Sequence, residues 1–424
     1  MSVVEAREVV IAPPDARLVG RAIDRPRPGE RSDGTSVDLV GWVLGRSARA
    51  VALEIVHEAR VVQRLTLDHR RPDLVKAFPD VAHADEGGFR TQLRTLGMGE
   101  IELDLRAVLA DQDRVPLATL RLARRWREEA YHAAAPLVSV VIPCYDQARF
   151  LHEAIESVLA QSYPHLECVV VDDGSHDNTS EVAARYPGVT LVRQENAGLS
   201  AARNTGLRHS SGAYLVFLDA DDRLLPNALA DGLAAFAEHP EAAFVAGHHR
   251  PIDSDGVPMS AGIDGAPVYP VDHHYRELLR DNFISMPGTV MFRRPVFEIV
   301  GGFTEGVDAS ADYDLYLRIA RDLPISCHDS VVGEYRRHEG AMSRDPERML
   351  RAILTTLRAQ WPIARESKDT RAAYREGWAN WTKLYGDELT RDVKDQLAKG
   401  DWGASLHGVR SLLGLYPRGL RHLR

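Results

Sequence analysis

Five aspartates stand in two short clusters that could bind a cation or a nucleotide. Asp172 and Asp173 begin the sequence Asp-Asp-Gly-Ser, and Asp219, Asp221 and Asp222 belong to Asp-Ala-Asp-Asp. Each cluster follows a run of apolar residues. Crowded carboxylates repel one another, and a hard divalent cation held by one or two carboxylates and substrate phosphates relieves that repulsion. The Asp-Ala-Asp turn therefore predicts a divalent-cation site.

Both clusters would also make ordinary turns. Asp, Gly and Ser are common turn and N-cap residues, so Ser175 or Asp177 could simply cap the next helix. A lone Asp-x-Asp is too short to decide between the two interpretations. The position after a buried strand, with a second acidic cluster nearby, favours binding. In that interpretation one carboxylate of the Asp172–Asp173 pair accepts a base N–H, and Gly174 lets the backbone approach closely.

Residues 137 to about 222 carry the pattern that must position these clusters. Four apolar runs, at 138–143, 166–173, 189–194 and 213–222, alternate with segments of helical periodicity. Such runs, too short for helices and rich in Val, predict a parallel sheet covered by helices. Ligands bind at the carboxyl ends of the strands in such sheets, where both acidic clusters fall. The sequence lacks the Gly-x-Gly-x-x-Gly, Walker A, Gly-x-Ser-x-Gly and His-Glu-x-x-His motifs.

Three other regions flank this pattern. Residues 1–125 show short alternating apolar runs separated by turn-rich segments, which predicts an all-β, sandwich-like accessory domain. Residues 126–136 are predicted to be a short helical linker. The α/β pattern continues to about 343, and residues 344–424 read as a helical C-terminal region.

Composition limits the class of protein. The 424 residues are 44% hydrophobic and 27% charged, with a net charge of −9, so a globular chain that does not bind nucleic acid is expected. No apolar run approaches the roughly 20 residues of a membrane span, and the N-terminus has no secretory signal pattern. Three cysteines make no disulfide framework. These features favour a cytoplasmic location.

Several longer motifs, in order, carry a family resemblance. VSVVIPCYDQARFLHEAIESVLAQSYPHLECVVVDDGSHDNTSEV, ENAGLSAARNTGL and YLVFLDADD resemble the nucleotide-binding half of family 2 glycosyltransferases with the GT-A fold. GTVMFRRPVFEIVGGFTEGVDASADYDLYLRIA and YRRHEGAMS resemble the acceptor side and the closing segment of that family. The resemblance covers residues 137–343. It implies a GT-A nucleotide-sugar-binding domain between the β-sandwich-like domain and the helical region.

The resemblance also implies roles for individual residues. Asp312 falls where the family keeps its general base, and Asp221 and His338 fall at metal or diphosphate positions. The residues implied in donor binding are Pro143, Tyr145, Asp173, Arg203, Asp219, Ala220 and Asp222. Cys144 lies within the first motif, but no partner base for a nucleophilic thiol is evident. The family usually has Glu-Asp at the base motif, where this chain has Ala311-Asp312.

The implied activity is a metal-dependent, inverting transfer of a sugar from a nucleotide-sugar, expected to be a UDP-sugar, to an acceptor hydroxyl. The cofactor would be Mn²⁺ or Mg²⁺, and the acceptor a cell-envelope glycan precursor. Two alternatives stay open: glycosylation of a peptide or natural product, and a non-catalytic sugar- or nucleotide-binding protein. Sequence does not identify the sugar or the oligomeric state.

The C-terminal sequence LLGLYPRGLRHLR mixes apolar and basic residues. It could lie on the anionic inner face of a membrane, as a peripheral contact. The alternative interpretation is a solvated helix end or a packing tail.

Overall fold

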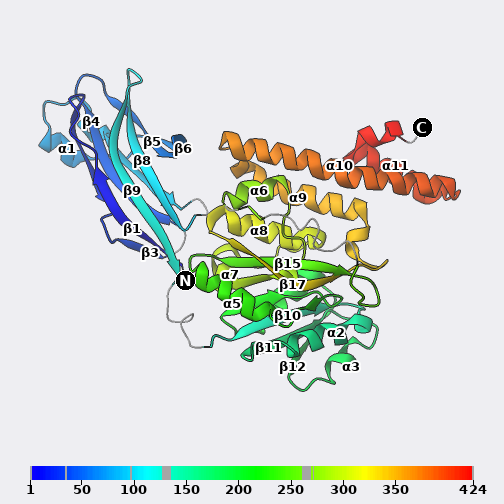
Figure 1. Cartoon of the computed structure of the whole chain (residues 1–424). Coiled ribbons are helices and arrows are strands. Elements are labelled where there is room, and N and C mark those ends of the chain that lie inside the picture. Colours follow the sequence, from blue (N-terminus) through cyan, green and yellow to red (C-terminus); the bar gives the residue numbers. More distant parts are fainter. Residues whose placement is uncertain are drawn as a thin grey trace. The chain divides into compact units, whose positions relative to one another are not determined.

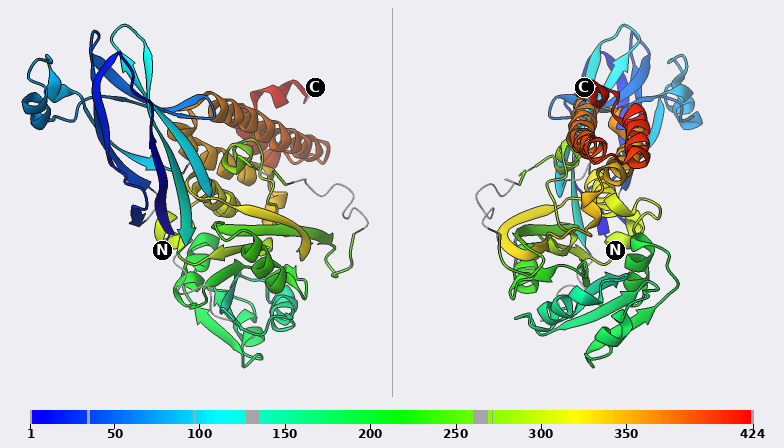
Figure 2. Two further views of the ribbon diagram at one scale, coloured as in Figure 1. Left: turned by 60° about the vertical axis from the view of Figure 1, so that its left-hand side comes forward. Right: turned by 90° about the vertical axis from the view of Figure 1, so that its right-hand side faces the viewer.

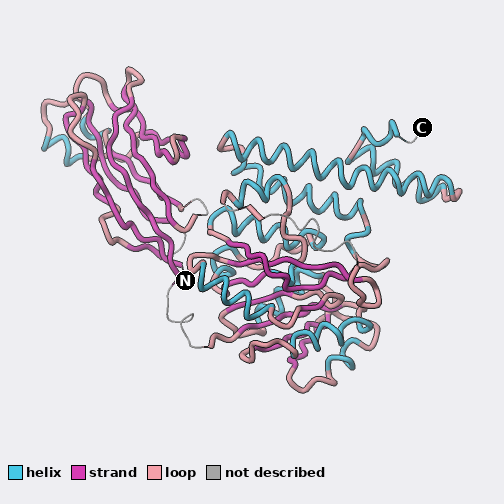
Figure 3. Tube along the Cα trace, in the orientation of Figure 1, coloured by secondary structure: helices cyan, strands magenta, loops and turns pink. Residues whose placement is uncertain are grey.

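The structure is a computed structural model that describes residues 2–33, 36–95, 98–126, 135–259, 269–270 and 272–422. Most of the predicted linker, residues 127–134, lies outside the described residues. The chain divides into two compact units: the strands β1 to β9 belong to the first, and β10 with the later sheet and helices belongs to the second. Figures 1 and 3 show the β-rich and the mixed unit.

The first unit is a β-sandwich, as expected. A six-stranded sheet of order β3-β1-β9-β8-β5-β6 packs against a three-stranded sheet of order β2-β4-β7. Alternating residues of both sheets, such as Leu39 of β4 and Leu103 of β8, bury their side chains in one core. The strands are β1 (Ser2–Ile11), β2 (Leu18–Arg25), β3 (Arg31–Asp33), β4 (Ser36–Gly45), β5 (Ala50–His57), β6 (Arg60–Thr66), β7 (Gly88–Arg94), β8 (Glu100–Leu109) and β9 (Arg114–Trp126), with helix α1 (Pro72–Ala77).

The second unit is built on an eight-stranded sheet of order β12-β11-β10-β13-β16-β15-β17-β14. The four strands predicted from the apolar runs, β10 to β13, are parallel to one another. The other half is mixed, since β16 pairs antiparallel with β13 and β15 while β15 pairs parallel with β17. The strands are β10 (Val138–Cys144), β11 (Leu166–Asp172), β12 (Val189–Arg193), β13 (Tyr214–Phe217), β14 (Arg223–Leu224), β15 (Phe244–Ile252), β16 (Val290–Arg293) and β17 (Ser326–Arg336).

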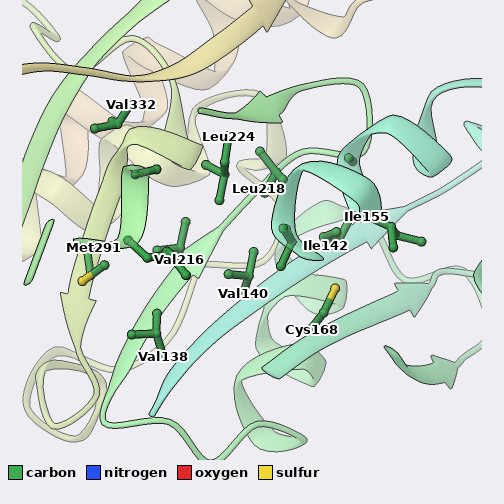
Figure 4. Packing of buried hydrophobic residues seen from close by; sticks show 14 of the residues in the cluster. Val138, Val140, Ile142, Ile155, Cys168, Val216, Leu218, Leu224, Met291 and Val332 are labelled. Carbon is green, nitrogen blue, oxygen red and sulfur yellow. The ribbon is translucent and has the colours of Figure 1, made fainter. Parts of the chain in front are cut away.

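The central parallel strands are largely apolar because helices cover the sheet. Every residue of β10 is buried, and Val138, Val140 and Ile142 pack with Val216 of β13 and Ile155 of α2 (Figure 4). The helices of this unit that precede the C-terminal region are α2 (Ala148–Leu159), α3 (Thr179–Ala183), α4 (Leu199–Arg208), α5 (Ala228–Glu238), α6 (His274–Arg280), α7 (Val296–Val300) and α8 (Ala311–Asp322).

The C-terminal region is helical, as expected, with α9 (Pro346–Ala364), α10 (Lys368–Ala398) and α11 (Trp402–Leu415). These helices share one compact unit with the sheet. Tyr313 of α8 donates a hydrogen bond to the Leu278 carbonyl of α6, and Ser310 bonds Thr356 of α9. The predicted boundary at 343/344 is therefore a change of secondary structure within one unit (Figure 2). In the described part of the chain, no helix is both long and apolar enough to cross a membrane.

Candidate active site

A cavity of about 570 Å³ opens beside the carboxyl ends of β10, β11 and β13. This is the edge where a parallel sheet presents its loops to ligands. Nine of the residues implied by the resemblance line the cavity, and the tenth, His338, bonds one of them. The nine are Pro143, Tyr145, Asp173, Arg203, Asp219, Ala220, Asp221, Asp222 and Asp312.

Two loops are tied together at the first side of the cavity. Asp146, directly after β10, has a left-handed backbone (φ 52°), and its N–H donates to Ser175 Oγ over 3.1 Å. The His176 N–H donates back to Asp146 Oδ1 over 2.6 Å. Asp177 Oδ2 accepts the first N–H of α2, from Ala148. This network holds Tyr145, 43% exposed, at the rim.

Asp172 and Asp173 have different hydrogen-bond partners. Asp172 faces the protein, where burial acts to raise its pKa but hydrogen bonds from Ser180 and Ser175 hold the pKa below its usual value. Asp173 lines the cavity. It accepts hydrogen bonds from Gln194 Nε2 (2.7 Å) and from the N–H groups of Ala197 and Gly198 (both 3.0 Å).

Two glycines allow the loops around Asp173 to lie close together. Gly174 has φ +76°, and a Cβ there would lie 2.8 Å from the Asn196 nitrogen. Gly198 has φ +91°, and a Cβ there would lie 2.6 Å from Asp308 Oδ2. Asp308 in turn accepts the Ser200 N–H at the start of α4. Any residue with a side chain would therefore separate the loops that present Asp173 and Asp308 to the cavity.

Arg203 of α4 is the buried positive charge of the site. Its side chain is 2% exposed, and Nη2 donates to Asp219 Oδ1 over 2.6 Å. The guanidinium also lies 5.2 Å from the centroid of the Phe303 ring. Burial raises the pKa of Asp219, and the nearby Asp221 carboxylate raises it further, although Arg203 opposes both effects.

The carboxylates of Asp221 and Asp222 have different partners. Asp221 Oδ2 lies 2.9 Å from His338 Nε2. Asp222 is 2% exposed and accepts the Arg336 N–H over 2.8 Å. Burial, together with the charges of Asp221 and Asp219, raises the pKa of Asp222 well above its usual value.

Arg336 supports this turn and was not singled out from the sequence. Its side chain is fully buried, with Nε donating to the Asp221 carbonyl (2.7 Å) and Nη2 to Glu153 Oε2 (2.7 Å). It also stacks over the Phe150 ring. Its position two residues before His338 was the available signal, but the adjacent pair Arg336-Arg337 looks like a surface segment.

The side chains at this turn suit a hard cation that also has phosphate ligands. The described residues contain no group of three or more His, Cys, Asp or Glu side chains arranged to hold a metal. Asp221 and His338 nevertheless meet beside Asp219 and Asp222, whose pKa values are raised by burial and by the charge of Asp221. One or two carboxylates with substrate phosphates are what Mg²⁺ ordinarily requires, so the residues fit such an ion.

Asp312 begins α8, after the 3₁₀ turn Asp308–Ser310, and lines the cavity. A helix N-terminus alone would lower its pKa. Burial dominates instead and raises the pKa, against the opposing charge of Arg203. Ala311, in place of the family's Glu, is fully buried. Tyr316, one turn along α8, keeps its hydroxyl buried with no hydrogen-bond partner among the described residues.

Cys144 has neither the exposure nor the charge state of a nucleophile. Its thiol is 3% exposed, and burial raises its pKa to about 12. The nearest polar partner is Thr179 Oγ1, at 3.6 Å. The thiol is therefore a packing group at neutral pH.

The helical C-terminal region also contributes walls to this cavity. Arg348 and Met349 of α9 line the same cavity as Asp312. A second cavity, of about 500 Å³, is lined by Tyr335 and His338 on one side and by Tyr385 of α10 on the other. It shares Tyr335, Ala341 and Ser343 with the first cavity.

Comparison with known proteins places the site in a family. Residues 139–301 match the model of "Glycosyl transferase family 2". The chain is 32% identical over 222 residues to a chondroitin synthase of Escherichia coli, covering 48% of this chain and 30% of that protein. It is 30% identical over 197 residues to a hyaluronan synthase of Pasteurella multocida, covering 46% of this chain and 20% of that protein. The matched part is thus a third or less of these relatives.

Among solved structures, a mannosyltransferase from Pyrobaculum calidifontis has a TM-score of 0.46 and 21% identity, over 69% of this chain and 84% of that one. The mixed sheet with its acidic edge and the family match together confirm the GT-A fold predicted for this region. Residues 139–301 of this chain therefore form a region that is similar to glycosyl transferase family 2.

Proposed function

We propose that the chain transfers a sugar from a nucleotide-sugar donor, with UDP as the nucleotide, to a hydroxyl group of a glycan. The observation that carries this proposal is one cavity that brings together Asp173, Arg203, Asp219, Asp221 and Asp312. No single local motif would collect a base-binding carboxylate, a cation-binding turn and a third, protonatable carboxylate in one place.

The donor would lie along the carboxyl edge of the sheet. Asp173 keeps acceptor capacity for a base N–H, since a carboxylate offers about four lone-pair sites and three are used. Tyr145 at the rim can cover the base. Asp219, held by Arg203, would face the ribose, and Ala220 and Asp222 shape the turn beside the sugar. Asp221 and His338 would hold Mn²⁺ or Mg²⁺, which when bound neutralises charge on the donor diphosphate.

The proposed chemistry is a single displacement. The acceptor hydroxyl attacks the anomeric carbon from the face opposite the diphosphate, the bond to the diphosphate breaks, and the anomeric centre is inverted. Asp312 takes the hydroxyl proton. Its raised pKa suits a base, because a carboxylate that binds protons more tightly accepts one more readily.

A glycan acceptor, here a cell-envelope precursor, is supported by the second cavity. That cavity joins the first at Tyr335 and offers two tyrosines, Tyr335 and Tyr385, whose rings can pack on sugar faces. The chondroitin and hyaluronan synthases among the relatives bear names of glycan products. A chain that bound donor without any turnover would instead be a sugar- or nucleotide-binding protein.

The test is UDP affinity with and without Mn²⁺, followed by release of UDP from a UDP-sugar. Asp221→Ala should lose the affinity gained from Mn²⁺ while the protein stays folded. Asp255→Ala, an exposed carboxylate 78% accessible in a loop, is the matched control and should keep that gain. If Asp221→Ala keeps the full gain, the cation is bound elsewhere. If the unaltered chain binds UDP but never turns over a donor, the enzymatic proposal fails.

A further inference from the structure

Helix α11 exposes a line of large apolar side chains. Trp402 is 73% exposed, Leu406 54% and Leu413 57%. Trp402 has the largest exposed fraction of any large apolar side chain in the described part of the chain. Since successive residues of an α-helix turn by about 100°, the three side chains fall within about 40° of one another around the helix axis. They therefore form one outward stripe, here called the α11 stripe.

The packing of α11 fixes the direction of this stripe. Ser405, Gly408 and Leu412 are buried on the opposite face. A Cβ at Gly408 would lie 2.4 Å from Val393 Cγ2, so α11 approaches α10 as closely as a glycine allows. Figure 2 shows the two helices side by side near the C-terminus. Rotation of α11 to hide the stripe would break this contact.

The structure changes the membrane interpretation of the sequence. Of the apolar residues in LLGLYPRGLRHLR, Leu412 is buried, and Tyr416 and Leu420 pack against the cluster of Leu389 and Val393. Among the residues of this segment whose side chains are described, 412–420, Leu413 is the exposed large hydrophobic residue. Most of the segment is thus the packing tail, and the exposed apolar surface lies one to three turns earlier.

Positive charge surrounds the α11 stripe. Lys399, Arg410 and Arg418 are exposed, and none of them forms an ion pair with a described residue. From residue 399 to residue 424 the sequence has five Lys or Arg residues and a single acidic one, Asp401. Asp401 is the N-cap of α11, accepting the Ala404 N–H over 3.0 Å.

We propose that the α11 stripe lies on an anionic lipid bilayer surface. Trp and Leu would enter the boundary between headgroups and acyl chains, while the neighbouring Lys and Arg contact lipid phosphates. A second copy of the chain fits less well, because pairing two stripes would bring the unpaired cations of both copies together. The proposal does not depend on the proposed sugar transfer, since the stripe shares no residue with either cavity.

The experiment is co-sedimentation of the full chain with vesicles of phosphatidylcholine, or of phosphatidylcholine with about one third phosphatidylglycerol. We expect binding to the anionic vesicles that weakens with salt. Replacing Trp402→Ser, Leu406→Ser and Leu413→Ser together should weaken it by about 10-fold or more. Lys399→Gln, Arg410→Gln and Arg418→Gln together should remove the preference for phosphatidylglycerol.

The matched control carries three serines at other exposed apolar positions outside α11: Val10→Ser, Leu159→Ser and Val257→Ser. It should bind vesicles as the unaltered chain does. The proposal is overturned if the full chain ignores anionic vesicles, or if the α11 variant binds them normally. It is also overturned if the stripe variant abolishes a dimer seen by light scattering, since a second copy then covers the stripe.

Discussion

At the scale of single residues, Asp312 is the side chain whose replacement should separate catalysis from stability. Asp312→Asn keeps size and shape but cannot take a proton. We expect transfer or donor turnover to fall by about 10²–10⁴. UDP affinity should be unchanged, because the proposed function assigns Asp312 to the acceptor and not to the nucleotide. The measurement is turnover beside calorimetric UDP binding; near-normal turnover would move the base to Asp308, which lines the same cavity.

The same substitution should make the ligand-free protein more stable. The pKa of Asp312 is raised from its ordinary 3.8. The folded protein thus holds this proton more tightly than the unfolded chain, so stability falls as the pH rises from about 3.8 through the raised pKa. Asp312→Asn avoids that loss. At neutral pH the Asp312→Asn protein should therefore unfold at a higher temperature than the unaltered protein.

Thermal unfolding at several pH values checks this prediction. The gain of Asp312→Asn should shrink as the pH falls towards 3.8, where the native carboxyl is already protonated in both states. If Asp312 only supplied a stabilising charge at the start of α8, its replacement by Asn would instead lower the free energy of unfolding by about 0.3–1 kcal/mol at neutral pH. A less stable Asp312→Asn protein at pH 7 would therefore favour that simpler role.

At the scale of elements, the end of β17 holds the acidic turn through Arg336. Arg336→Gln would remove the hydrogen bonds to the Asp221 carbonyl and to Glu153, although Glu153 keeps its ion pair with Arg223. The loss of these charge-assisted hydrogen bonds should cost about 1.5–3 kcal/mol. We also expect weaker Mn²⁺-dependent UDP binding, because the turn that presents Asp221 loses its anchor. The measurements are urea unfolding and calorimetry.

The neighbouring Arg337 supplies the matched control. Its side chain is exposed, so Arg337→Gln should change the free energy of unfolding by no more than about 0.5 kcal/mol. Equal effects of the two substitutions would show that the charge of this segment, and not the buried network, supports the site.

The close packing of helix α4 on strand β10 depends on Gly206. A Cβ there would lie 2.1 Å from Val141 Cγ1, so Gly206→Ala should cost about 1–3 kcal/mol through overpacking. The shift of α4 should also weaken UDP binding, because Arg203 is on the same helix. Gly188→Ala, with no atom within 4 Å of the added Cβ, is the control and should unfold like the unaltered chain.

At the scale of the whole molecule, the two compact units suggest that the β-sandwich is dispensable for donor binding. Each unit has its own hydrophobic core. A shortened protein beginning at residue 135 should bind UDP about as tightly as the full chain. Calorimetry and thermal unfolding provide the measurement, and loss of folding or of UDP binding would show that the sandwich supports the site.

Local sequence determined the elements and the positions of the acidic clusters. The all-apolar β10 predicted a strand covered on both faces, and Asp173 and Asp219 could be placed at strand ends from the order of the apolar runs alone. These predictions succeed because hydrophobic periodicity is a local property of the sequence. The order of apolar and polar residues in each strand reflects which of its faces are buried. The resemblance then implied roles for ten residues, which the fold brings together.

Tertiary structure decided what each of those side chains does. Asp222 is buried beneath Arg336, Asp312 has a raised pKa, and Arg348 reaches the cavity from a helix assigned to another region. Burial and charge at these atoms come from segments more than 30 residues away in the chain, so no local pattern contains them. The α11 stripe follows the same rule: Leu412 and Leu413 are adjacent and chemically identical, and only packing against α10 buries one and exposes the other.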